Sequence, residues 1–467
     1  MLRALVRPII RIVERWIPDS LVFAILLTFI VALMGLGLTD SGPVEVVRAW
    51  GDGLAGLLSF IAQISIVLAL GYTLANTNQV RRFLRSIAGV PRSATVAYGY
   101  VTLIAGLASL ISWGIGLIVG GIMAVQVAKS AQERGIRLHY PLLVACAYSG
   151  FVVWHMGYSG SGPLAAATPG SFFEDLGPLV PVTQTIFAWW NILAIVLVLG
   201  AVALTMALLA PRGDEDIIEL KADANPLDDS QEQGSDSTST TDSPEVDQGG
   251  GDEHDEGKTP AQRADNSRVI TLSIGVALVA YLVVYFAQEG FALTLDIVNW
   301  SFLAAILLLV KSPAQLVALI SDAGKTVGQI LLQYPLYAGI LGIITATGLV
   351  EIFGAFFVSI SNAQTLGIFT MLFAGIVNFF VPSGGGQFAI QAPIFINAAD
   401  QLDVSHNVII MAISYGDQWT NMIQPFWTIP ILAVAGLRIR DILGYTTVTL
   451  LVSGVVMAGI LLILGPG

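Results

Sequence analysis

Apolar runs, many of them long enough to cross a membrane as a helix, alternate with short polar or charged segments along most of this chain. A transmembrane helix needs about 20 predominantly apolar residues. The pattern therefore predicts an all-α polytopic membrane protein. The expected apolar segments are Leu21–Leu38, Leu54–Ala75, Ala94–Ala128, Pro141–Ala167, Ile186–Ala210, Val269–Ala287, Leu295–Val310, Val327–Val350, Thr365–Ala398, Val408–Ala435 and Ile442–Leu464.

Four polar, glycine-rich breaks interrupt these runs: Ser112–Gly116, Trp154–Pro163, Asn378–Pro393 and Ser414–Pro425. Backbone that leaves the helix at membrane depth survives only where protein or a wet cavity satisfies its N–H and C=O groups. The second and fourth breaks predict broken transmembrane helices, and the third predicts a re-entrant hairpin. The first break allows two short crossings or a second hairpin, and its polarity favours the hairpin. Breaks paired across two halves indicate a secondary transporter.

The distribution of Lys and Arg predicts the orientation of these segments, because short cytoplasmic loops carry an excess of positive charge. The loop at 81–92 holds four arginines, so we expect the N-terminus to be cytoplasmic. The arginines of the first 15 residues predict a basic amphipathic helix on the membrane surface, followed by an uncleaved first span. In this orientation one hairpin enters from inside and the other from outside, which predicts an inverted-topology repeat.

The acidity of the chain lies in one segment. The 467 residues are 55% hydrophobic and only 12% charged, with a formal net charge of −12. Residues 213–268 hold 17 Asp and Glu against 4 Lys and Arg, a charge of −13, so the rest of the chain sums to +1. This segment predicts a disordered cytoplasmic linker, with a regulatory binding tail as the alternative. The expected domains are an N-terminal membrane repeat (1–212), the linker (213–268) and a C-terminal membrane repeat (269–467).

Several classes of function lack support in the composition. No basic patch indicates nucleic-acid binding. Cys146 is the only cysteine, and the four histidines show no metal-ligand spacing. We therefore expect no cofactor, no nucleic-acid partner and no metal other than a transported Na⁺.

The hairpin tips and broken helices are expected to converge near the bilayer midplane, where helix N-termini present N–H groups and positive dipole ends. Ser383 and the three glycines after it can bring N–H groups close to a carboxylate, although a triple glycine is also a simple flexible turn. Amides in apolar runs need a partner or a substrate, and some will only tie helices together. The predicted substrate-binding residues are Ser159, Ser161, Thr168, Asn378, Ser383, Gly384, Gly385, Gly386, Gln387, Gln391, Trp419, Asn421 and Gln424.

Asp417 is the one carboxylate inside the fourth break. An intramembrane acid is a functional candidate by default. Asp417 therefore predicts coupling of transport to a cation, either as a carrier of H⁺ or as a ligand of Na⁺. The alternative is that Asp417 caps the half-helix that follows it.

The predicted substrate is a small monocarboxylate. None of the four breaks contains Lys or Arg, so the site lacks the guanidinium that multiply charged anions usually recruit. Indole rings such as those of Trp154, Trp419 and Trp427 can surround an apolar tail. Each buried methylene contributes only about 0.8 kcal/mol, so we expect weak discrimination among chain lengths.

Seven long and unusual motifs carry a family resemblance: Arg15–Asp19, Ala49–Gly53, Trp113–Gly116, Ser159–Gly170, Asn378–Pro393, Tyr415–Trp419 and Gln424–Trp427. On these motifs the chain resembles the short-chain fatty acid transporter family over nearly its whole length, apart from the acidic segment. The resemblance implies uptake of short-chain fatty acids such as acetoacetate or butyrate, and more distantly an ion-transporter superfamily architecture. It also implies an acidic residue at the position of Asp417. His155 and the acidic segment depart from the family pattern.

Two alternative functions compete with this one. A carrier of the same fold could take dicarboxylates or amino acids. The Gly157–Gly160 sequence has the Gly-x-Ser-Gly form of an intramembrane serine protease, but that chemistry needs a histidine on another span facing Ser159. His155 lies on the same segment without an obvious orienting acid, and it is interpreted as a satisfied residue of the helix break rather than a proton relay. We expect a multi-pass protein of the inner (cytoplasmic) membrane that is not an enzyme, and carriers of this architecture are often homodimers.

Overall fold

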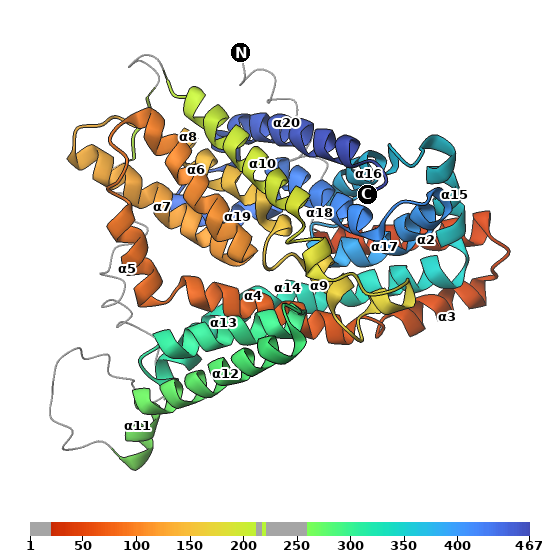
Figure 1. Cartoon of the computed structure of the whole chain (residues 1–467), viewed down its shortest axis with the longest axis horizontal. Helices are drawn as coiled ribbons and strands as arrows, with labels where there is room; N and C mark the ends of the chain where they lie inside the picture. The colour runs from red at the N-terminus through yellow and green to blue at the C-terminus, as the bar shows by residue number, and fades with distance from the viewer. Residues whose placement is uncertain (1–19, 212–216, 221–258) are drawn as a thin grey trace.

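The computed structural model describes residues 20–211, 217–220 and 259–467, and all regular structure in these ranges is helical (Figure 1). The first half contains α2 (Ser20–Leu38), α3 (Pro43–Gly53), α4 (Leu58–Ala75), α5 (Asn78–Ile87), α6 (Ala94–Ile111), α7 (Trp113–Glu133), α8 (Tyr140–Ser149), η1 (Gly150–Met156), α9 (Ser161–Ala167), η2 (Phe172–Asp175), η3 (Val182–Gln184) and α10 (Trp189–Leu208). The second half contains α11 (Pro260–Asp265), α12 (Arg268–Glu289), α13 (Leu295–Leu309), α14 (Pro313–Ala346), α15 (Leu349–Ile360), α16 (Leu366–Phe380), α17 (Gly384–Leu402), α18 (His406–Thr420), η6 (Asn421–Ile423), α19 (Pro425–Ala435) and α20 (Ile439–Leu464). The predicted all-α fold is confirmed, while the basic N-terminal helix lies outside the described residues.

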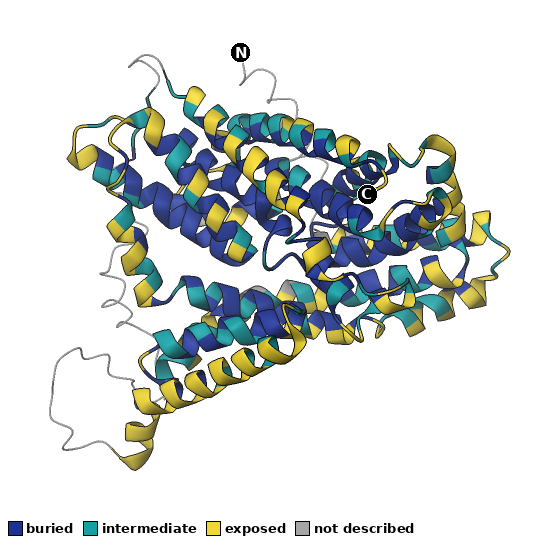
Figure 2. Cartoon of the chain, in the orientation of Figure 1, coloured by how far each residue is buried: buried dark blue, intermediate teal, exposed yellow. Residues whose placement is uncertain are grey.

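Seven segments in the described ranges are long and apolar enough to cross a membrane: α4, α6, α7, the segment Tyr140–Ala167, α10, α12 and α20. An eighth exists if α14 is one bent span, since its parts Pro313–Lys325 and Ile330–Ala346 meet at 48°. Only 11% of the apolar window of α12 is buried, and Figure 2 shows this helix exposed along almost its whole length. Such a surface suits lipid rather than water. The prediction of a polytopic membrane protein is confirmed.

The helices form a bundle that packs on an elongated frame (Figure 1). In the frame, α14 runs along α2, α3 and α4, and α13 joins α4 to α12. The bundle contains α6 to α10 and α16 to α20, and its interior is almost wholly buried (Figure 2). Helix α17 contacts both parts, because it packs on α14 and α15 as well as on α9 and α18. The start of α17 is thereby held where the bundle meets the frame.

Both predicted broken helices are present. The first runs from α8 through η1 and an irregular stretch into α9, and the second from α18 through η6 into α19. The break in the first of these helices, Trp154–Pro163, lies directly on the α6–α7 turn. The N–H of Tyr158 donates to the carbonyl oxygen of Leu110 at 2.7 Å, and a Cβ at Gly157 would lie 2.3 Å from that same oxygen. A neighbouring helix end thus satisfies the broken backbone, as a membrane interior requires.

Helix–turn–helix structures occupy both predicted hairpin positions. The helices α6 and α7 meet at Ser112, and they pack against each other. The helices α16 and α17 are separated by residues 381–383, and Ser383 caps α17 by accepting the N–H of Gly386 at 3.1 Å. How far these hairpins reach into the bilayer, and the inverted relation of the two halves, stay predictions.

Two described parts of the acidic segment 213–268, residues 217–220 and 259–268, make defined contacts. The N–H of Tyr140 donates to the carbonyl oxygen of Ile218 at 2.7 Å, and Leu220 is buried. At the other end α11 begins with a capping box at Thr259. The predicted disorder of this segment stays a prediction. The rest of the segment lies outside the described residues.

Replacing Gly150 with alanine is expected to lower the free energy of unfolding by about 1–3 kcal/mol. The added Cβ would lie 2.5 Å from the nitrogen of Gly106 and 2.6 Å from the carbonyl oxygen of Thr102. In the control Gly200→Ala the new Cβ meets nothing within 4 Å, and stability should stay equal or rise by up to about 1 kcal/mol. Thermal unfolding in detergent measures both, and equal midpoints would contradict this packing.

Candidate functional site

A cavity of about 610 Å³ lies where the bundle meets the frame. Its wall is mostly aliphatic and aromatic. The polar residues that line it are Tyr72, Ser159, Ser161, Lys325, Gln333, Tyr334 and Ser383. A concave, largely apolar pocket with a few convergent polar groups has the form of a small-molecule binding site.

The first turn of α17 forms one wall of this cavity, because Ser383, Gly384 and Gly385 line it. The N–H groups at a helix N-terminus attract anions. Glycine is required here by close contacts. A Cβ at Gly384 would lie 2.5 Å from the indole of Trp154 and 2.9 Å from the hydroxyl of Ser161. The backbone of α17 is therefore as close as it can be to the first broken helix.

Helix α14 adds the polar side chains of Lys325, Gln333 and Tyr334 to the cavity wall. The hydroxyl of Tyr334 lies beside Ser383 and the first turn of α17. The Nζ of Lys325 lies 2.7 Å from Asp322 Oδ1, and both side chains are largely exposed. This lysine comes from a helix outside the four breaks, and no guanidinium group is among the described residues that line the cavity. One ammonium group still suits one carboxylate better than two.

Three tryptophans close another side of the cavity. The rings of Trp113 and Trp427 meet edge to face at 5.2 Å, and those of Trp154 and Trp427 lie 6.3 Å apart. The Nε1 atoms of Trp154 and Trp427 are buried without a hydrogen-bond acceptor. Trp419, which was predicted to bind substrate, instead donates its Nε1–H to the carbonyl oxygen of Leu450 at 2.7 Å and does not line the cavity.

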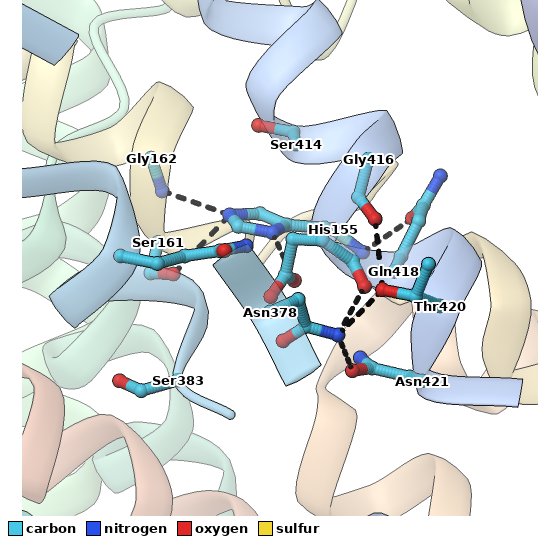
Figure 3. A network of polar contacts seen from close by, with 12 residues as sticks. His155, Ser161, Gly162, Asn378, Ser383, Ser414, Gly416, Gln418, Thr420 and Asn421 are labelled. Atoms are coloured by element: carbon cyan, nitrogen blue, oxygen red, sulfur yellow. Dashed lines mark hydrogen bonds and ion pairs between the residues drawn. The ribbon is translucent and has the colours of Figure 1, made fainter. Parts of the chain in front are cut away.

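The imidazole of His155 connects the two broken helices directly behind the cavity wall. Its Nδ1 lies 2.8 Å from Asp417 Oδ2, and both side chains are fully buried. Its Nε2 accepts the N–H of Gly162 at 3.0 Å and lies 3.2 Å from the hydroxyl of Ser161. Figure 3 shows the ring of His155 between these α9 residues and the residues of α18. A cavity-lining hydroxyl is therefore in hydrogen-bond contact with a buried histidine–aspartate pair.

A cluster of amides surrounds the end of α18. The Nδ2 of Asn378 lies 2.9 Å from the carbonyl oxygen of Asp417, 2.9 Å from Thr420 Oγ1 and 2.6 Å from Asn421 Oδ1 (Figure 3). The Nε2 of Gln424 donates to the carbonyl oxygen of Asn378 at 3.0 Å. These amides hold the third and fourth breaks together, and they do not line the cavity.

Other predicted residues serve the helices themselves. The hydroxyl of Thr168 donates to the carbonyl oxygen of Leu164 and accepts the N–H of Leu295, so it ties α9 to α13. Gln391 donates to the side-chain oxygen of Gln387 at 3.1 Å inside α17. Of the predicted substrate-binding residues, the cavity brings together Ser159, Ser161, Ser383, Gly384 and Gly385.

Two expectations about the buried pair are wrong. Asp417 does not cap a half-helix, because it lies inside α18 and its carboxylate contacts His155. His155 does have an orienting acid, because α18 brings Asp417 to its Nδ1. This contact does not support the alternative of an intramembrane serine protease. The hydroxyl near the ring is that of Ser161, while Ser159 Oγ in the Gly-x-Ser-Gly sequence has no hydrogen-bond partner.

Sequence reasoning left several residues out of the site. His155 carried a usable signal, since an ionisable residue in a membrane span is a functional candidate by default. The backbone N–H of His155 also donates to Gln418 Oε1 at 3.0 Å. Lys325 and Tyr334 had no such signal, because only the path of α14 brings them to the cavity.

The profile of the family described as "Short chain fatty acid transporter" matches residues 1–464 of this chain. The chain belongs to the short-chain fatty acid transporter family. A protein of Escherichia coli strain K12, provisionally named as such a transporter, is 38% identical over 446 residues, which is 96% of each chain. A provisionally named Haemophilus influenzae homologue is 35% identical over 447 residues, 94% of each chain. The family resemblance drawn from the motifs is confirmed.

A solved structure supports the fold of this family member independently. The Alcanivorax borkumensis YdaH transporter, whose topology is described as unusual, is similar with a TM-score of 0.60 at 17% sequence identity. The alignment covers 96% of this chain and 99% of the other. At that identity the similarity concerns the fold alone, which is that of a multi-pass membrane transporter.

Replacing Asn378 with alanine is expected to lower the free energy of unfolding by about 1–3 kcal/mol, because buried polar partners lose their donor. Transport should fall with it, since Asn378 joins two breaks. The control Asn266→Ala removes an exposed asparagine that bonds only within its own helix end, and it should leave both unchanged. Thermal unfolding and uptake are measured on the same preparations of both variants. A fully stable Asn378→Ala protein would show that the amide cluster is not structural.

Proposed function

We propose that this family member is a cation-coupled carrier that takes short-chain monocarboxylates, such as butyrate or acetoacetate, across the cytoplasmic membrane by alternating access. The observation that supports this most is the first turn of α17 in the wall of a largely apolar cavity. Asp417 is the proposed coupling residue, for H⁺ or Na⁺. The proposed orientation has the N-terminus and the acidic segment in the cytoplasm.

The proposed carboxylate seat is the first turn of α17 with the adjacent hydroxyls. Gly384 and Gly385 line the cavity with backbone that carries no side chain, and Ser159, which also lines it, has a buried Oγ without a partner among the described residues. Lys325 adds an ammonium group at the wall, where it is paired with Asp322. These groups suit one carboxylate.

The proposed seat for the acyl tail is the tryptophan and aliphatic wall. A short chain buries only a few methylenes, each contributing about 0.8 kcal/mol. The cavity volume of about 610 Å³ exceeds what such a chain fills. Weak selection among chain lengths follows from both facts.

Purified protein in liposomes should take up labelled butyrate faster than protein-free vesicles when an H⁺ or a Na⁺ gradient is imposed, and excess succinate should compete poorly. The physical reason is that the cavity offers seats for one charge and an apolar tail. Uptake of succinate or an amino acid in place of butyrate would retain the carrier fold and overturn the proposed substrate.

Replacing Gly384 with alanine should reduce butyrate uptake at least about tenfold, because the methyl group would enter the proposed carboxylate seat against Trp154 and Ser161. The control is Gly459→Ala in α20, where the new Cβ meets nothing within 4 Å. Uptake is compared on protein that elutes as a single species from gel filtration. Normal uptake by the Gly384→Ala protein would remove the α17 N-terminus from the substrate path.

A further inference from the structure

We propose that His155 and Asp417 together carry the coupling proton of this carrier, and that Ser161 connects them to the cavity. This inference rests on the proposed carrier function, because it names the coupling ion and the groups that hold it. It starts from a contact that no single segment of the sequence contains, between η1 of the first broken helix and α18 of the second.

The hydrogen bonds around the ring define its protonation in this conformation. The N–H of Gly162 donates to Nε2 of His155 at 3.0 Å, so Nε2 must be an acceptor. The ring proton is then on Nδ1, where it is donated to Asp417 Oδ2 at 2.8 Å. The histidine is then neutral, and with Asp417 in its ionised form the buried pair carries one negative charge.

A buried pair with a net charge costs free energy in a membrane protein, and one added proton removes that charge. Two neighbouring groups favour the protonated form of the pair. The indole of Trp154 stacks on the imidazole with ring centres 4.2 Å apart, a geometry that favours a cationic ring. Asp417 Oδ1 is buried without a hydrogen-bond partner, so it can hold the proton in the neutral form of the pair.

The same proton controls whether an anion can bind beside the pair. The hydroxyl of Ser161 lies 3.2 Å from His155 Nε2, and a Cβ at Gly384 would lie 2.9 Å from the same hydroxyl. The proposed carboxylate seat is thus one side chain away from the pair. Two negative charges at that separation repel strongly in a low dielectric. Proton and substrate therefore enter together, and one proton per monocarboxylate keeps the charge of the empty and loaded carrier equal.

Proton loading also has a direct route to the backbone. A proton from the cavity reaches Nε2 through the hydroxyl of Ser161, and the Nδ1 proton passes to Asp417. Protonation of Nε2 breaks its bond from the N–H of Gly162, which lies in the first turn of α9. Loading therefore releases a contact between the two parts of the first broken helix.

The surroundings of Asp417 favour a proton over Na⁺, which needs several oxygen ligands such as unwound carbonyls. Donors already engage Oδ2 and the backbone carbonyl oxygen of Asp417. His155 occupies Oδ2, and Asn378 Nδ2 lies 2.9 Å from the backbone carbonyl oxygen of Asp417. Gln387 lies beside the carboxylate, and its own oxygen accepts from Gln391.

The other titratable groups near the pair in the described part of the chain do not change charge at neutral pH. Lys325 and Tyr334 of α14 line the cavity. Tyr148 of α8 donates to the carbonyl oxygen of Asn421, and Tyr415 of α18 donates to Asn191 Oδ1. Phenols stay neutral and lysine stays charged in this range. The histidine–aspartate pair is the remaining acid–base pair beside the cavity in this part of the chain.

The test uses the full-length chain in liposomes with labelled butyrate outside and a pH-sensitive dye inside, and protein-free vesicles correct for passive entry of the protonated acid. An imposed proton gradient is expected to drive accumulation, a sodium gradient is not, and the dye should report one proton per butyrate. Exchange of labelled against unlabelled butyrate, which needs no gradient, measures carrier activity separately.

Asp417→Asn and His155→Gln each remove the titrating pair but keep a polar side chain. The apparent affinity of the wild type for butyrate in exchange should weaken about tenfold between about pH 6 and about pH 8. Both variants should lose this dependence together with proton-driven accumulation. The matched control is His406→Gln, which breaks a histidine–aspartate pair of 2.7 Å with Asp400 away from the cavity. It should behave as wild type.

The outcomes separate the two proposals. A wild type that exchanges no butyrate would overturn the carrier function itself. Exchange with sodium-driven accumulation and no proton movement would retain the carrier and overturn the role of the pair. If the pH dependence persists in both variants, the proposed role of the pair is overturned as well. His155→Gln supplies the same comparison if the aspartate variant is not recovered as folded protein.

Discussion

The contact between His155 Nδ1 and Asp417 Oδ2 joins two side chains that are 262 residues apart in sequence and fully buried. Each belongs to a helix that breaks in the interior of a membrane protein, where loose polar groups are costly. His155 Nδ1 and Asp417 Oδ2 each find their hydrogen-bond partner on the other broken helix, so each helix satisfies a polar group of the other. Removing one member would leave the other uncompensated. The position of both broken helices therefore depends on this pair.

Glycines make that arrangement possible, because they let one backbone lie against another. Gly157 rests on the carbonyl oxygen of Leu110, and Gly416, next to Asp417, would place a Cβ 2.2 Å from the carbonyl oxygen of Met371. Gly384 does the same against Trp154. The broken segments, the start of α17 and the cavity are thus brought together by missing side chains, while the hydrogen bonds fix their orientation.

Polar groups in the centre of the protein divide into two sets. The amides around Asn378 bond to one another and to backbone, and they lie behind the cavity wall. The residues that line the cavity include Ser159, Trp154 and Trp427, whose buried Oγ and Nε1 atoms have no hydrogen-bond partner among the described residues. Satisfied amides stabilise the scaffold, while unsatisfied donors on a cavity wall can turn to a ligand. Ser161 lines the cavity and is bonded to His155, so it connects the cavity to the histidine–aspartate pair.

The sequence by itself determined the helical membrane fold, the positions of both broken helices and the family, because apolar run length and misplaced glycines are local signals. It also indicated Asp417 and the start of α17 as candidate site residues. Only the tertiary structure decided which candidates meet. It placed Asp417 on His155, moved Trp419 away from the cavity and brought Lys325 to it. The reason is that contacts between segments hundreds of residues apart depend on how helices pack, and a list of residues along one chain does not contain that information.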